Sequence, residues 1–185
     1  IDTVGITRPC TKMNYLVQHA DELATVLREA FHLGTKGRPG PVLVDIPKDV
    51  TTERTCVRRP APVLLRGYRP ERAGAEDDVR RAVQMIASAS RPVLYIGGGA
   101  LTAADEVLAL ATRMRLPVTP TLMGLGCFPA RHPLSLGMLG MHGTYAANMA
   151  ISEADVIVAI GVRFDDRVTG ALDKFAPNAA IVHVD

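Results

Sequence analysis

The chain has 185 residues, of which 48% are hydrophobic and 22% charged, a composition typical of a folded globular protein that excludes a mainly disordered one. Its apolar runs are much shorter than the roughly 18 residues that a membrane-spanning helix needs. Its net charge of +2 is too balanced for a general nucleic-acid binder. Its three cysteines lie far apart and form no zinc-binding pattern, so we expect reduced thiols, a cytoplasmic location and no metal site.

The first part of the chain predicts one amphipathic helix followed by one strand. Residues 21–33 carry an apolar helical face, with Asp21 as a plausible N-cap. The residues of this face are Leu23, Val26, Leu27, Ala30 and Phe31. Residues 41–45 predict a short buried strand whose partner strands we expect upstream of Ile1. Residues 1–50 are therefore predicted to be the tail of an α/β domain.

Residues 51–75 are predicted to be an extended linker, because arginines and prolines cluster there and no sustained apolar period is present. A helix is expected at residues 76–88, where an acidic first turn suits the helix dipole. Val79, Val83 and Ile86 are expected to face inward.

From residue 93 onward, short apolar strands alternate with helices. Strands are expected at 93–96, 117–119, 156–160 and 181–184, and helices at 102–114 and 144–151. Thr102 and Asp105 are spaced as a capping box for the first of these helices. The alternation predicts an α/β fold over residues 76–185, with a parallel sheet flanked by helices and right-handed crossovers.

Glycines, arginines and carboxylates follow these strands, at the edge where parallel sheets bind ligands. They occupy residues 97–99, 121–126, 139–143 and 161–170, and position 185. Together they predict a dinucleotide site, with arginines on diphosphate and carboxylates on ribose. Taken singly, the segment 161–170 is better explained as a surface turn in which Asp165 or Asp166 caps a helix. Asp185 lies 86 residues after Gly99 rather than the ~20 of the usual fingerprint, which argues against ordinary NAD binding.

Other side chains with potential chemistry form no catalytic set. No histidine is spaced from a serine, cysteine or aspartate in a way that predicts nucleophilic catalysis, and His183 is expected to pack inside a strand. Met138 and Met141 lie in a long loop, where methionines usually pack but can also line a cofactor or substrate channel.

Five segments resemble successive blocks of one family, the catalytic subunit of acetohydroxyacid synthase (acetolactate synthase). The segment 37–49 (GRPGPVLVDIPKD) resembles the end of the family's first domain. The segments 92–99, 121–126, 138–144 and 163–170 resemble its middle domain, in family order, and 163–170 (RFDDRVTG) is the most specific. One departure is Met13, where the family usually has histidine, so the first-domain tail is expected to pack differently.

The resemblance implies a thiamine-diphosphate-dependent enzyme that joins two pyruvates, or pyruvate and 2-oxobutyrate, in branched-chain amino-acid synthesis. It implies thiamine diphosphate and Mg²⁺ between the first and third domains of paired subunits, and a structural FAD in the middle domain. It also implies 2-oxoacid substrates, a homo-oligomer of catalytic subunits and a separate regulatory subunit.

The resemblance assigns two sets of residues. Positions corresponding to FAD contacts are Arg38, Gly98, Gly99, Thr121, Leu122, Leu139, Gly140, Met141, His142, Gly161, Val162, Arg163, Phe164, Asp165 and Asp185. Positions around the substrate and inhibitor channel are Lys12, Arg38, Lys48, Asp166 and Arg167.

The resemblance also implies that the chain is a fragment. The thiamine-activating glutamate would lie before Ile1 and the Gly-Asp-Gly metal motif after Asp185, so no catalytic residue is assigned and the isolated chain is expected to be inactive. One alternative is a related FAD-containing carboligase such as glyoxylate carboligase. A second alternative is a free-standing nucleotide-binding or regulatory module.

Overall fold

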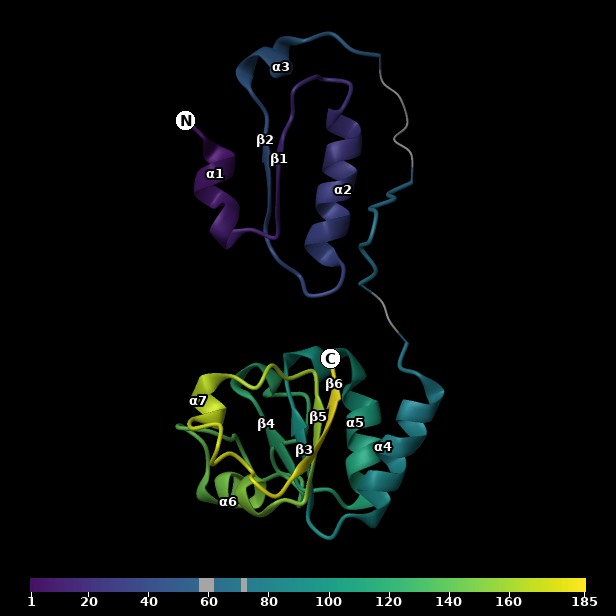
Figure 1. Ribbon diagram of the computed structural model, residues 1–185, viewed down its shortest axis with the longest axis vertical. Helices are drawn as coiled ribbons and strands as arrows, with labels where there is room; N and C mark the ends of the chain where they lie inside the picture. The colour runs from purple at the N-terminus through teal and green to yellow at the C-terminus, as the bar shows by residue number, and fades with distance from the viewer. Residues whose placement is uncertain (57–61, 71–72) are drawn as a thin grey trace. The chain divides into compact units, whose positions relative to one another are not determined.

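A computed structural model describes residues 1–56, 62–70 and 73–185 of the chain (Figure 1). The chain divides into two compact units, residues Ile1–Ala73 and Gly74–Asp185, and each is described by itself. Of the expected linker at residues 51–75, the segments 57–61 and 71–72 lie outside the described residues.

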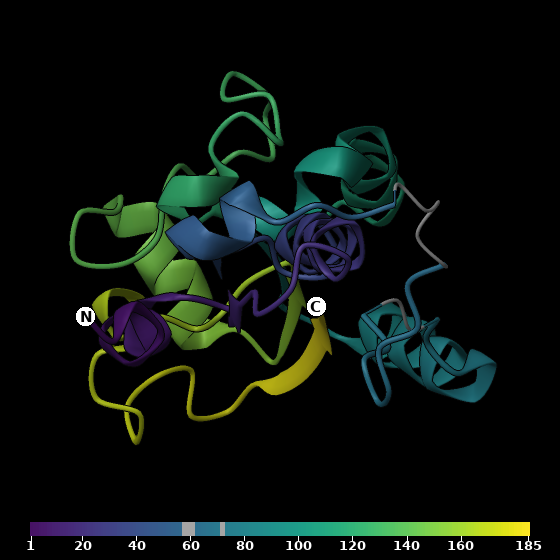
Figure 2. The same ribbon diagram turned by 90° about the horizontal axis from the view of Figure 1, so that it is seen from above.

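The first unit is built on two parallel strands. Its elements are α1 (Thr3–Thr7), the 3₁₀ helix η1 (Arg8–Cys10), β1 (Met13–Leu16), α2 (Leu23–Thr35), β2 (Val42–Asp45) and α3 (Lys48–Thr52). Helices α1 and α2 lie on opposite sides of the strands, and α2 runs alongside them, as its end-on view in Figure 2 makes clear.

Strand β1 corrects the expectation that the partner of β2 lies upstream of Ile1. Met13 aligns with Val42 and Leu16 with Asp45, in parallel register. The sequence Met-Asn-Tyr-Leu is short and includes a polar residue, so it carries no clear strand period. The pairing is a tertiary contact that local pattern alone does not reveal.

Helix α2 buries a narrower stripe than its apolar pattern predicts. Ala30 and Leu33 are buried, but Leu27 and Phe31 are exposed, Phe31 by 74%. Two strands of four residues each cover only one narrow face of the helix. The predicted N-cap, Asp21, is also wrong, because Glu22 occupies the N-cap position. Asp21 lies in a turn in which the Glu22 N–H donates to the His19 carbonyl at 3.1 Å.

The second unit has a parallel sheet with helices on both faces, which confirms the predicted fold class (Figure 1). Its strands are β3 (Pro92–Ile96), β4 (Val118–Pro120), β5 (Val156–Ile160) and β6 (Ala180–Val184). Its helices are α4 (Glu76–Ser88), α5 (Ala104–Met114), α6 (Tyr145–Glu153) and α7 (Asp166–Thr169), with the 3₁₀ helices η2 (Gly98–Ala103) and η3 (Leu122–Gly124). Helices α4 and α5 lie on one side of the sheet, and α6 and α7 on the other (Figure 1).

Alternate residues of the central strands supply two separate cores. In β3, Leu94 and Ile96 join the core under α4 and α5, whereas Val93 and Tyr95 join the core on the opposite face. Burial on both faces explains why these strands are continuous apolar runs instead of alternating ones.

Two expectations about the helices of this unit are wrong. Val79 and Val83 are more than half exposed, because α4 packs on the core mainly through Ile86 and its last turn. Thr102 caps no helix: it lies within η2, and α5 begins at residue 104 with no side-chain cap.

Asp155 ties the start of the sheet to the loop after α4. Its carboxylate accepts hydrogen bonds from the backbone N–H groups of Ser90 (2.6 Å) and Arg91 (2.9 Å). Partial desolvation works to raise the pKa of Asp155, but these hydrogen bonds outweigh it and hold that pKa below its usual range.

The strand order of the sheet is β4-β3-β5-β6. All strands are parallel, but successive strands are added first on one side of β3 and then on its other side. The connection from β3 leads outward to β4 through α5, whereas β5 and β6 add to the other edge of β3. In open parallel sheets, ligands bind at the carboxyl end of such a switch point. The topology therefore places a candidate site at the ends of β3 and β5.

Candidate cofactor site

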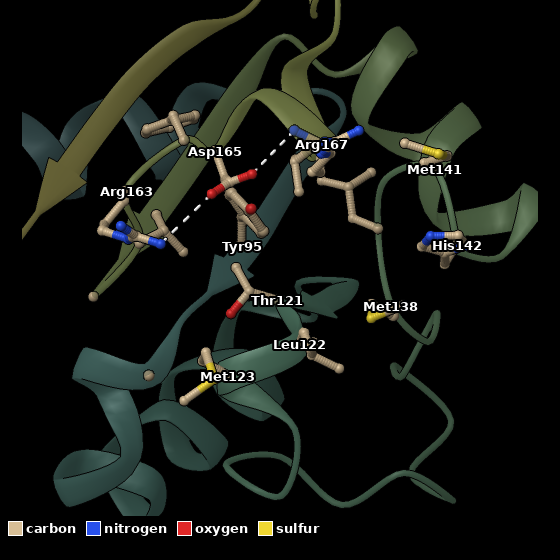
Figure 3. A pocket seen from close by; sticks show the side chains of 16 residues that line it. Tyr95, Thr121, Leu122, Met123, Met138, Met141, His142, Arg163, Asp165 and Arg167 are labelled. Atoms are coloured by element: carbon tan, nitrogen blue, oxygen red, sulfur yellow. Dashed lines mark hydrogen bonds and ion pairs between the residues drawn. The ribbon is translucent and has the colours of Figure 1, made fainter.

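A cavity of about 330 Å³ opens at this switch point (Figure 3). Its lining comes from the ends of β3, β4 and β5 and from the loop before α6. The lining residues are Tyr95, Gly98, Thr121, Leu122, Met123, Met138, Leu139, Met141, His142, Gly161, Val162, Arg163, Phe164, Asp165, Arg167 and Val168. Four segments that are far apart in the sequence thus line one cavity.

Glycines bring the backbones after β3 and β5 together beneath the cavity. The Gly99 N–H donates to the Gly161 carbonyl (3.1 Å), and the Gly97 N–H donates to the carbonyl of Ile160 (2.9 Å). A Cβ on Gly97 would overlap the Gly161 carbonyl oxygen. The first glycine of the run therefore serves the close approach of two loops, whereas Gly98 faces the cavity.

The loop after β4 presents apolar side chains to the cavity. Thr121 caps η3, because its Oγ1 accepts from the Gly124 N–H at 3.0 Å. The short turn holds Leu122 and Met123 in largely exposed positions, 68% and 71%, on the cavity wall.

The methionine loop before α6, residues 138–142, is anchored at its middle. The Asn148 side chain exchanges two hydrogen bonds with the backbone of Gly140, at 3.1 and 3.2 Å. The Met141 N–H donates to the Arg167 carbonyl at 3.1 Å. Met138 and Met141 both line the cavity, as one of the two interpretations of this loop predicted.

Charged groups come from the loop after β5. Arg163 lies 3.5 Å from the Asp165 carboxylate, measured from Nη2 to Oδ2, and the Arg167 backbone N–H donates to Asp165 Oδ1 at 3.0 Å (Figure 3). The hydrogen bond from the Arg167 N–H, with help from Asp166 and the nearby arginines, holds the pKa of Asp165 below its usual range. Asp165 is also the N-cap of α7, which confirms the prediction that Asp165 or Asp166 caps a helix. The same residue lines the cavity.

Tyr95 is a cavity residue that the sequence interpretation missed. It occupies the fourth position of β3 and is fully buried, and its ring meets that of Phe164 edge to face at 5.8 Å. The one available signal is a tyrosine at the carboxyl end of an otherwise aliphatic strand. Met123 and Val168, which the resemblance did not assign individually, line the cavity within two of the predicted segments, 121–126 and 161–170.

Most residues assigned to FAD by resemblance meet in this cavity. The exceptions within the second unit are Gly99 and Gly140, which pack behind it against Gly161 and the Arg167 backbone, and Asp185, which follows β6. Arg167, assigned to the substrate channel, lines the same cavity as Arg163, whereas Asp166 does not line it.

Three assigned residues belong to the first unit. Arg38 and Lys48 are exposed there. The Lys12 ammonium donates to the carbonyls of Lys36 (2.7 Å) and Arg38 (2.9 Å) and to the Tyr68 hydroxyl (3.0 Å). Lys12 thereby anchors the loop that carries Arg38.

Two kinds of feature are absent from the residues that the structure describes. Residues 1–56, 62–70 and 73–185 contain no cluster of three or more histidine, cysteine or carboxylate side chains that could hold a metal ion. Within the same residues, no helix has the length and apolar character required to cross a membrane.

The fold and the cavity define an α/β domain with a candidate ligand site at its switch point, and comparison with known proteins assigns its family. A family model described as "Thiamine pyrophosphate enzyme, central domain" matches residues 61–185. The chain therefore belongs to the thiamine pyrophosphate enzymes and carries their central domain.

Individual relatives narrow the similarity further. The chain is 49% identical over 185 residues to the acetolactate synthase isozyme 1 large subunit of Escherichia coli K12, across its whole length and 33% of the relative. It is 50% identical over 192 residues to the acetolactate synthase of Arthrospira platensis (33% of that protein). It is 47% identical over 190 residues to a probable acetolactate synthase large subunit of Methanocaldococcus jannaschii (32% of that protein).

These matches confirm the resemblance that the sequence blocks indicated. The chain spans about a third of the length of the relatives it matches.

Proposed function

We propose that this chain is a segment of an acetolactate synthase catalytic subunit, which joins two pyruvates, or pyruvate and 2-oxobutyrate. The observation that carries the proposal is 47–50% identity to acetolactate synthases, sustained over the whole chain. In this proposal, residues 1–50 are the tail of the domain that binds the thiamine pyrimidine, and residues 76–185 are the cofactor-binding central domain.

The cavity of the second unit is proposed to hold FAD. An extended ligand with a charged diphosphate and a flat apolar ring system needs both cations and apolar walls. Arg163 and Arg167 supply guanidinium groups suited to phosphate oxygens, and Leu122, Met123 and Met138 supply apolar surface. The residues that are present therefore fit FAD.

The chain's own residues give this cofactor a structural role. FAD supplies a rigid scaffold to the domain when it is bound, without redox turnover. Arg163 and Arg167 would neutralise its negative charge, while Asp165 holds the loop that carries both arginines. Because the cavity joins loops from three strands and the methionine loop, a bound cofactor would couple them into one rigid surface.

The other roles that the resemblance implies are proposed as well. Lys12, Arg38, Lys48 and Asp166 are proposed to lie along a substrate channel, and Asp185 to bind ribose. Thiamine diphosphate would supply carbanion chemistry with Mg²⁺ in a polypeptide of the relatives' length. The words "large subunit" in the names of several relatives support a separate regulatory partner, beside a homo-oligomer of catalytic subunits.

A segment swap tests the proposed activity. The alignment to the Escherichia coli isozyme 1 large subunit is as long as the chain itself, so residues 1–185 can replace the matching third of that enzyme. We expect this chimera to form acetolactate from pyruvate with thiamine diphosphate, Mg²⁺ and FAD present, measured as acetoin after acidification. The unmodified isozyme is the positive control. A folded chimera that binds FAD but forms no acetolactate would contradict the proposed activity.

A further inference from the structure

The hydroxyl group of Tyr95 is buried without a partner. Tyr95 has 0% relative exposure. Among the residues that the structure describes, its Oη is the one buried side-chain polar atom with no hydrogen bond. Burying a hydroxyl without a hydrogen bond is costly, so native proteins supply an acceptor from the protein, a ligand or water.

The ring of Tyr95 is held rigidly in a position that faces the cavity. It packs edge to face on Phe164, with the ring planes at 67°. Figure 3 shows Tyr95 at the cavity between Asp165 and Thr121. A strand residue on the apolar face of a packed sheet has little freedom to turn its hydroxyl elsewhere.

The neighbouring carboxylate of Asp165 makes no hydrogen bond to this hydroxyl. The Asp165 carboxylate accepts from the Arg167 N–H at 3.0 Å and pairs with Arg163 at 3.5 Å. Burial, with a smaller contribution from the Asp165 charge, raises the pKa of Tyr95 to about 12. The phenol therefore keeps its proton at neutral pH and is available as a donor.

We propose that Tyr95 is a cofactor-binding residue, whose hydroxyl donates a hydrogen bond to an acceptor atom of FAD bound in this cavity. The inference rests on the proposed FAD site and adds a residue that neither the motifs nor the resemblance assigned. Three observations carry it: complete burial, an unpartnered hydroxyl and a place on the cavity wall.

Tyr15 offers a matched control in the first unit. Its hydroxyl donates to Glu29 Oε2 at 3.2 Å, so its hydrogen bond is made within the chain. Replacing Tyr15 by phenylalanine removes the same hydroxyl group, but it breaks a bond that exists without any ligand.

The test compares Tyr95→Phe and Tyr15→Phe in the segment-swapped full-length chimera. The dissociation constant of FAD is measured by equilibrium dialysis, and the melting temperature is measured on the FAD-free protein. We expect Tyr95→Phe to raise the FAD dissociation constant by about tenfold and to leave the FAD-free melting temperature unchanged or higher. Tyr15→Phe is expected to lower that melting temperature and to leave the FAD affinity unchanged.

Three results would overturn the inference in distinguishable ways. If the unsubstituted chimera binds FAD and Tyr95→Phe binds it within twofold as tightly, the hydroxyl has another partner, such as a fixed water. If the unsubstituted chimera binds no FAD, the proposed FAD site fails and this inference fails with it. A general packing defect would lower the FAD-free melting temperature of Tyr95→Phe, which the proposal excludes.

Discussion

Replacing Gly97 by alanine tests the junction beneath the cavity. The backbone of Gly97 is extended, with φ at −119°, so alanine suits its conformation. The obstacle is steric: the new Cβ would overlap the Gly161 carbonyl oxygen and lie 2.8 Å from Val162 Cγ1. Because the overlapping atom is backbone, the loop after β5 must move to accommodate the methyl group.

The expected effect is a loss of about 3 kcal/mol in the free energy of unfolding of the second unit, at the upper end of what overpacking costs. Hydrogen exchange of amides in β3 and β5 measures that free energy for this unit alone. Gly126→Ala is the control: its Cβ would meet nothing within 4 Å, so its cost is limited to the backbone strain of a positive φ of +94°, about 1–3 kcal/mol. If Gly97→Ala proved as stable as the parent chain, or more stable than Gly126→Ala, the proposed steric junction would be wrong.

Further substitutions test other contacts. In the chimera, Arg163→Ala should weaken FAD binding by roughly 10- to 100-fold and Arg167→Ala by less, as flavin absorbance after dialysis measures; the reverse order would refute this ranking. The depressed pKa of Asp155 means that its contribution to stability is present above pH ~4 and is lost as pH falls further. Asp155→Asn should therefore have a lower free energy of unfolding at pH 7 than the parent, and that free energy should fall less as the pH is lowered below ~4. Urea titrations at several pH values measure both, and an unchanged pH dependence in acid would refute the prediction. Lys12→Met should speed hydrogen exchange in residues 36–40, because the Lys12 ammonium binds the carbonyls of Lys36 and Arg38. Unchanged exchange would show that Lys12 does not anchor this loop.

The central strands β3 and β5 of the second unit could be predicted because they are buried on both faces. A strand such as β5 is then a continuous apolar run that local sequence reveals. The clustering of loop residues at one sheet edge follows from parallel topology, so the candidate site could also be located before the fold was known.

The features that escaped prediction depend on tertiary contacts. Strand β1 exists through its pairing with β2, and the exposure of Val79 and Phe31 depends on how far neighbouring elements extend over each helix. Apolar period identifies one face of a helix, but it does not say how much of that face is covered.

Tyr95 illustrates the same limit within the site. Strand period places it on one face of β3 with Val93, which is consistent with a core residue. Its unpartnered hydroxyl becomes evident only when every neighbouring acceptor has been located.

Hydrogen exchange of the chimera with and without FAD tests the central claim most directly, because it reports where the cofactor binds. We predict slower exchange on adding FAD in the loops at residues 97–100, 121–124, 138–142 and 161–168, which form the cavity. Saturable FAD binding that leaves exchange in all four loops unchanged would contradict the assignment of this cavity as the cofactor site.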